Sequence, residues 1–169
     1  LDLSLSLNKY GALIFIDLDN FKTLNDTKGH SYGDKLLKDT AKILSKCIRD
    51  CDTVARFGGD EFLIILPYLD SNKEIALEDV TLVADRVLSS LETVFVGDDF
   101  QHSVTASIGI TMFIGNVITP EELFKRVDSA MYQAKNSGRN NYKFFDPSLQ
   151  SELEYRAKIS SEIVNAIVN

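Results

Sequence analysis

Cysteine is scarce in this 169-residue chain, in which Cys47 and Cys51 are the only two. These residues lack the further Cys or His partners that complete a structural zinc site. Reduced thiols of this kind are typical of proteins in a reducing compartment. The cysteine content therefore argues against a zinc-binding fold and indicates a cytoplasmic segment.

Basic residues are also fewer than acidic ones: the chain has 18 Lys and Arg residues and 25 Asp and Glu residues, which gives a formal net charge of −7. Nucleic-acid binding generally rests on clustered Lys and Arg side chains that neutralise many backbone phosphates. No nucleic-acid partner is therefore expected. A small phosphorylated ligand that is carried with metal ions stays compatible with this charge.

Long apolar runs are missing as well: none approaches the about 20 residues that cross a bilayer, and the first residues lack the regions of a signal peptide. This leaves open a membrane anchor elsewhere in a longer parent chain. Hydrophobic residues nevertheless make up 44% of the sequence, which is enough for one buried core. We therefore expect one globular domain.

The hydrophobic periodicity predicts alternating strands and helices. Strands are expected at residues 12–16, 53–57, 62–66, 103–111 and 142–145, and helices at 20–27, 31–48, 74–94 and 119–138. Thr119, Pro120 and Glu122 predict the start of the last of these helices, and Gly138 predicts its end. One antiparallel hairpin combined with helical crossovers predicts an α+β fold, with a mixed central sheet and helices packed over it.

Acidic residues stand at the ends of two predicted strands. Asp17 and Asp19 follow strand 12–16, whereas Asp60 and Glu61 lie in the turn between strands 53–57 and 62–66. Magnesium prefers carboxylate oxygens, waters and substrate phosphates, so Asp17 and Asp60 are candidate metal ligands. The alternatives are a solvated strand end for Asp17 and a simple turn residue for Asp60.

Two glycines, Gly58 and Gly59, precede this acidic pair. Without side chains they let the backbone approach a phosphate closely, and they permit unusual turn dihedrals. The alternative is merely a tight hairpin. The two interpretations are compatible with each other.

Residues 56–62 have the sequence RFGGDEF, which resembles the signature hairpin of the GGDEF family of diguanylate cyclases. Four further blocks resemble the family, at residues 17–26, 29–34, 107–110 and 130–140, so that the resemblance spans residues 11–146. It implies a nucleotide-cyclase or ferredoxin-like fold. It also implies the condensation of two GTP molecules into cyclic di-GMP and pyrophosphate, with two GGDEF domains facing each other as a homodimer.

The resemblance assigns the catalytic positions to the signature turn, which we define as residues 58–61. It implies that Asp17, the backbone carbonyl of Leu18, and Asp60 hold Mg²⁺ or Mn²⁺. Glu61 would assist the metal site or the activation of the attacking hydroxyl. Which carboxylate accepts the proton stays open. The catalytic residues implied are Gly58, Gly59, Asp60 and Glu61.

Substrate binding is implied for six residues, which are Phe21, Lys22, Asn25, Asp34, Lys135 and Arg139. The three cations suit terminal phosphates, and their alternative role is to complement helix ends. Asn25 and Asp34 match the positions that recognise the guanine edge, which needs an acidic acceptor and an amide. A local cap or turn for Asn25 and an exposed first-turn acid for Asp34 are the alternatives.

A product-inhibition site is implied by Arg49 and Asp52, which resemble the RxxD motif of the family, and by Arg86 as the secondary arginine. The alternative is a helix end with a favourable cation and a solvated turn acid. Residues 1–10 resemble a shortened form of the segment that precedes the family's first strand.

The chain end adds a further expectation, because residues 144–150 resemble the stretch before an EAL phosphodiesterase domain in tandem proteins. An amphipathic pattern from Leu149 to Ile167 predicts a connecting helix over 147–169. The expected partners are therefore GTP, cyclic di-GMP, a second GGDEF domain and a downstream EAL domain.

Two other functions remain as alternatives to the cyclase. One is a non-catalytic module that binds GTP or cyclic di-GMP, which an altered signature would favour. The other is a cyclase that makes a mononucleotide from one ATP, against which Asn25 and Asp34 argue.

Overall fold

The structure is a computed structural model that describes residues 9–92, 95–97, 100–102, 104–115 and 117–147. A five-stranded mixed sheet forms its centre, in the order β2-β3-β1-β6-β7. The strands are β1 (Tyr10–Leu18), β2 (Thr53–Gly58), β3 (Glu61–Leu66), β6 (Ala106–Ile114) and β7 (Asn141–Phe144). Only the β6–β7 pair is parallel, and the other three pairs are antiparallel. The predicted α+β fold with a mixed central sheet is confirmed.

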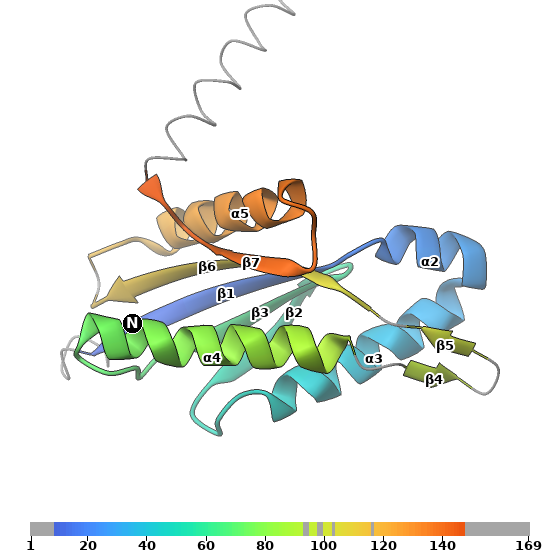
Figure 1. The fold of residues 1–169 in the computed structure, drawn as a ribbon, viewed down its shortest axis with the longest axis horizontal. Coiled ribbons are helices and arrows are strands. Elements are labelled where there is room, and N and C mark those ends of the chain that lie inside the picture. The colour runs from blue at the N-terminus through green and yellow to red at the C-terminus, as the bar shows by residue number, and fades with distance from the viewer. Residues whose placement is uncertain (1–8, 93–94, 98–99, 103, 116, 148–169) are drawn as a thin grey trace, which may run out of the picture.

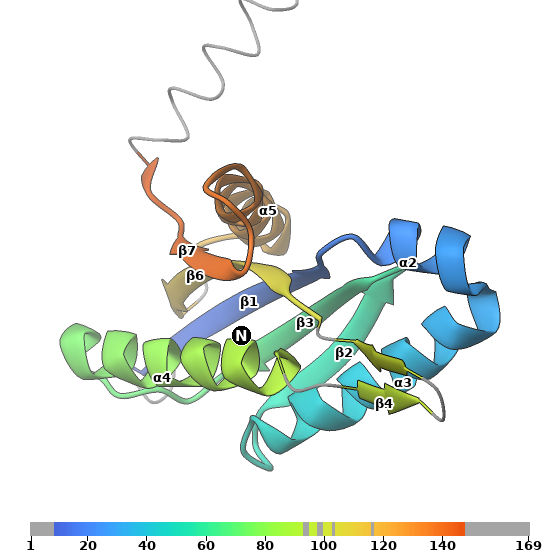
Figure 2. The same ribbon diagram turned by 45° about the vertical axis from the view of Figure 1, so that its right-hand side comes forward.

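Helices cover both faces of this sheet (Figure 1). α5 (Pro120–Asn136) lies on one face, and α3 (His30–Lys46) and α4 (Lys73–Leu91) lie on the other, as the turned view in Figure 2 also shows. The short helix α2 (Phe21–Lys28) joins β1 to α3 beyond the end of the sheet. None of the helices in the described part of the chain has the length and apolar character needed to cross a membrane.

The alternation of side chains along β1 explains the two helical layers, because successive residues of a strand point to opposite faces. Ala12, Ile14 and Ile16 belong to the core cluster that includes the buried faces of α3 and α4. Leu13 and Phe15 belong to the second cluster, which α5 completes. β1 is therefore buried on both faces and forms the central strand on which the site is built.

Helix starts follow the capping chemistry expected from the sequence. Thr119 accepts a hydrogen bond from the backbone N–H of Glu122 at 3.2 Å, and Pro120 occupies the first turn of α5, as predicted. Asn72 caps α4 in the same way and accepts from the N–H groups of Glu74 and Ile75. Gly138 lies just beyond α5 with a φ of 110°, a conformation that favours glycine.

The structure differs from the expected elements in three places. α4 ends at Leu91 rather than at residue 94, and β6 covers Ala106–Ile114 rather than 103–111. A two-stranded sheet of β4 (Phe95–Gly97) and β5 (Phe100–His102) was not predicted, because three-residue strands are too short to show a period. Most of the expected N-terminal lead-in and of the connecting helix over 147–169 lies outside the described residues.

Candidate active site

The signature turn lies beside the end of β1. β3 pairs with β1 so that Glu61 is opposite Asp17, and the N–H of Leu18 donates to the carbonyl of Asp60 at 3.3 Å. The four residues expected to form the metal and proton-transfer site are therefore neighbours. This proximity depends on the antiparallel register of β1 and β3, which brings a strand end and a hairpin tip together.

The turn itself has an open face. Gly59 has a φ of 50°, and the Nε of Arg56 donates to its carbonyl at 2.9 Å. A Cβ atom added at Gly58 or at Gly59 would meet no atom within 4 Å. The conformation of Gly59 therefore favours glycine, while the open space at both positions leaves room for a ligand to approach the backbone.

Carboxylates crowd this end of the sheet. Burial raises the pKa of Asp17, and the charges of Asp60 and Asp19 raise it further, while the hydrogen bond and charge of Lys135 oppose the increase. Burial also raises the pKa of Glu61, with further increases from Asp17 and Asp60. The site thus concentrates negative charge that a cation would stabilise.

Two basic residues from the end of α5 and the turn after it contact these acids. The Nζ of Lys135 lies 2.7 Å from Oδ2 of Asp17, and the Nε of Arg139 lies 3.9 Å from Oδ1 of Asp19. Both cations were predicted to bind terminal phosphates. The fold places them next to the carboxylates and leaves the side chains of Lys135 and Arg139 30% and 54% exposed, so both remain accessible to an anion.

The donor set fits magnesium that is brought with its substrate. Across the described ranges, no group of three or more His, Cys, Asp and Glu side chains is arranged to hold a metal ion. Two carboxylates, from Asp17 and Asp60, and the carbonyl of Leu18 would supply only part of an octahedral shell. Magnesium in nucleotide sites usually completes its shell with waters and phosphate oxygens, and Mn²⁺ accepts the same oxygen ligands.

Asn25 and Asp34, the residues expected to bind guanine, lie near the junction of α2 and α3. The side-chain oxygen of Asn25 is buried without a hydrogen-bond partner among the described residues. Asp34 is exposed one residue after Gly33. A Cβ atom at Gly33 would overlap this Asn25 oxygen and would lie 2.8 Å from its Cγ. Gly33 therefore makes room for the Asn25 amide, a role that the sequence did not indicate.

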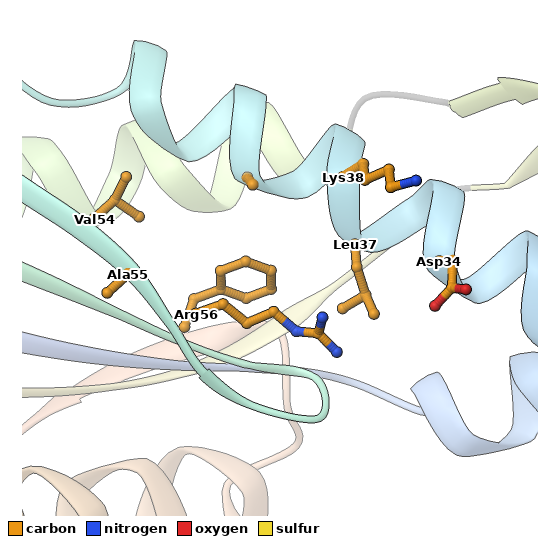
Figure 3. A pocket seen from close by; sticks show the side chains of 8 residues that line it. Asp34, Leu37, Lys38, Val54, Ala55 and Arg56 are labelled. Atoms are coloured by element: carbon orange, nitrogen blue, oxygen red, sulfur yellow. The ribbon is translucent and has the colours of Figure 1, made fainter.

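A pocket of about 370 Å³ opens between α3 and β2. Figure 3 shows its polar side chains, Asp34, Lys38 and Arg56, around an apolar floor. Asn25 is not part of this lining, so the pocket contains only one of the two predicted guanine ligands. The lining residues are Asp34, Leu37, Lys38, Ala41, Val54, Ala55, Arg56 and Phe62.

The other two substrate candidates begin α2. Phe21 is buried in the core beside β1, whereas Lys22 is exposed. Phe21 also lies 3.1 Å from the position of a Cβ atom at Gly33. Phe21 therefore supports the α2–α3 junction from beneath, and only Lys22 presents its side chain to solvent.

The three inhibition-site candidates meet around the end of α3. Asp52 accepts a hydrogen bond from the backbone N–H of Arg49 at 2.9 Å, and the Arg49 guanidinium lies 3.8 Å from Asp79. Arg86 reaches from α4 and donates to the carbonyl of Cys47 at 3.1 Å. This contact satisfies a carbonyl at a helix end, so part of the alternative, structural interpretation is also present.

Most of the chain is similar in sequence to a segment of several larger bacterial proteins. The chain is 36% identical over 156 residues to the probable diguanylate cyclase DgcE of Escherichia coli, covering 92% of this chain and 14% of DgcE. It is 31% identical over 156 residues to the cyclic di-GMP phosphodiesterase NbdA of Pseudomonas aeruginosa, covering 92% of this chain and 19% of NbdA. The chain thus corresponds to a small part of each relative.

A solved structure has the same fold. The EAL/GGDEF domain protein from M. capsulatus is 42% identical, with a TM-score of 0.72, and the match covers 82% of this chain and 86% of that chain. The family model described as "Diguanylate cyclase, GGDEF domain" matches residues 3–141. Since this match covers most of the sequence, the protein belongs to the GGDEF family.

Proposed function

We propose that this chain is a diguanylate cyclase domain that condenses two GTP molecules into cyclic di-GMP and pyrophosphate. One observation carries the proposal: Asp17 and Leu18 lie beside Asp60 and Glu61 of an unaltered signature turn that has an open face. Each domain would bind one GTP, so two facing domains are needed for the reaction.

In this proposal Asp17, the Leu18 carbonyl and Asp60 hold Mg²⁺ or Mn²⁺. The bound metal would neutralise the triphosphate and stabilise the charge that develops on it. Lys135 pairs with Asp17 at 2.7 Å, and a cation at Asp17 would free the Lys135 ammonium for a phosphate oxygen. Lys22 and Arg139 would add further positive charge around the phosphates.

The reaction happens twice, because each 3′-oxygen forms a bond to the α-phosphorus of the other GTP and two pyrophosphates are released in total. The bond between that phosphorus and the bridging oxygen of the β-phosphate breaks, and pyrophosphate leaves. Glu61 is suited to accept the hydroxyl proton, because its raised pKa makes it a stronger base than an exposed glutamate. Positioning and electrostatic stabilisation supply most of the catalysis, as in phosphoryl transfer generally.

Guanine would be selected at the α2–α3 junction. The Asn25 side-chain oxygen, which has no partner among the described residues, needs a donor, and the guanine edge offers N–H groups. Asp34 would accept from the same edge. ATP lacks this donor pattern, so the proposal favours GTP over ATP.

Product control is the second part of the proposal. Arg49, Asp52 and Arg86 surround the end of α3, and the Arg49 side chain is 61% exposed. Two arginines and one carboxylate suit the phosphates and guanines of cyclic di-GMP.

A downstream EAL phosphodiesterase domain in the parent chain is proposed from the EAL/GGDEF relative.

The test is incubation of the purified chain with GTP and Mg²⁺ and identification of the product by mass spectrometry. Cyclic di-GMP and pyrophosphate are expected with GTP, and no cyclic dinucleotide is expected with ATP. A segment 31% identical to this chain also lies in the phosphodiesterase NbdA, which favours a regulatory module as the second candidate. Tight GTP binding by a folded chain without any product would establish that second function instead.

A further inference from the structure

A second carboxylate at the end of β1, Asp19, has different surroundings from Asp17. Its side chain is only 1% exposed. Its two oxygens accept hydrogen bonds from Thr105 Oγ1 at 2.8 Å, Ser107 Oγ at 2.7 Å and the backbone N–H of Asn140 at 3.2 Å. With these donors in place, Asp19 is suited to hold protein groups rather than a metal ion.

The residues that Asp19 holds form a left-handed turn, which we define as residues 138–140. Gly138, Arg139 and Asn140 have φ values of 110°, 61° and 47° in succession. Left-handed backbone is uncommon for residues other than glycine, and it persists where surrounding contacts enforce it. Two consecutive non-glycine residues in this region therefore require an explanation from their contacts.

Those contacts come from several elements. The N–H of Arg139 donates to the Ala134 carbonyl at 3.2 Å, and the Asn141 amide donates to the Arg139 carbonyl at 2.7 Å. Asn140 donates from its side chain to Glu92 at 2.6 Å and from its backbone to Asp19. Asp19 ties this turn to the end of β1, in addition to the strand β7 that follows the turn.

The same carboxylate lies next to the Arg139 side chain. Asp19 Oδ1 is 3.9 Å from Arg139 Nε, yet the Arg139 side chain is 54% exposed. The buried Asp19 carboxylate thus faces one side of the Arg139 guanidinium. The remaining N–H groups of the guanidinium are available to a ligand. Asp19 thus contacts both the backbone that follows Arg139 and the charged group of Arg139.

We propose that Asp19 is a positioning residue that holds the left-handed turn, and with it Arg139, at the phosphate end of the nucleotide site. The inference rests on the proposed function, in which Arg139 contacts the terminal phosphates. Asp19 itself touches neither substrate nor metal. Its effect is exerted entirely through Arg139.

The test compares the affinities of two nucleotides by calorimetry in the presence of Mg²⁺. One is 3′-deoxy GTP, which lacks the attacking hydroxyl and cannot be turned over, and the other is GMP, which lacks the terminal phosphates. The Asp19→Asn variant keeps the shape of the side chain but removes its charge. It is expected to weaken triphosphate binding by about tenfold and to leave GMP binding unchanged.

Three further variants control this result. Asp39→Asn removes one negative charge from an exposed pair with Lys42 on α3 and is expected to change neither affinity. Arg139→Ala is expected to reproduce the loss of triphosphate binding. Asp19→Asn in the Arg139→Ala background is expected to cause no further loss, because coupled residues are not additive.

Equal losses for GMP and the triphosphate, an additive double variant, or an unchanged triphosphate affinity would each overturn the inference. If Asp19→Asn does not fold, Thr105→Val decides, because it removes one hydrogen bond to Asp19 and keeps the carboxylate. It should shift the same affinity ratio in the same direction, and no shift would overturn the inference. Binding stays measurable even if the chain makes no cyclic di-GMP, so failure of the proposed function is recognised separately.

Discussion

Gly33→Ala is predicted to separate stability from nucleotide selection. Gly33 lies inside α3, where alanine is favoured over glycine by roughly 0.5–1 kcal/mol. The added Cβ would overlap the Asn25 side-chain oxygen and would lie 3.1 Å from Phe21 Cζ. The Asn25 amide therefore has to rotate away, while the helix backbone needs no change.

The magnitude follows from the hydrogen bond that Asn25 is proposed to make with guanine. Loss of one such bond with its partner left unsatisfied costs about 1–3 kcal/mol, or roughly 5- to 150-fold in affinity. Adenine does not use the bond, so the preference for the guanine nucleotide should fall by this factor. The free energy of unfolding should change little, because the helix propensity gained opposes the strain at Asn25.

The assay measures binding of 3′-deoxy GTP and 3′-deoxy ATP by calorimetry and the free energy of unfolding by chemical denaturation. Ser45→Ala, an exposed change on the same helix, is the matched control. Gly33→Ala in an Asn25→Ala background should have no further effect on selectivity. An unchanged preference for guanine in a folded Gly33→Ala variant would refute the reasoning.

Three other predictions concern the signature turn and the proposed inhibition site. Asp60→Ala should lower cyclic di-GMP synthesis by about 100-fold or more and leave the unfolding curve near that of the wild type, because a carboxylate in a turn contributes charge to the site and little to core packing. Normal synthesis by the variant would contradict this prediction, and Asp39→Asn is the control. Burial and nearby acids raise the pKa of Glu61, so folding disfavours its ionised form and costs stability as the pH rises through that pKa. Glu61→Gln should therefore stabilise the metal-free chain at neutral pH, and the gain should vanish in acid, where both states are protonated; denaturation curves at the two pH values decide. Arg49→Ala should raise, by about tenfold, the concentration of cyclic di-GMP that is needed for inhibition. Superimposable inhibition curves for the wild type and the variant would show that Arg49 has only a structural role at the end of the helix.

Local patterns in the sequence determined the elements and the family. The apolar run that ends at Asp17, the turn residues at 58–61 and the cap at Thr119 each depend on neighbours within a few positions. Such patterns specify which residues start, end and line an element. They predicted the mixed sheet, the long helices and the acidic hairpin tip, but not the three-residue strands β4 and β5.

Tertiary structure alone decided which of these residues meet. Lys135 contacts Asp17, and Asp19 is buried against Thr105 and Asn140, because strand order places β6 and the end of α5 beside β1. The Asn25 amide likewise occupies the space that Gly33 leaves. A periodic pattern shows which face of an element is buried but not what buries it, since the partner is set by non-local pairing.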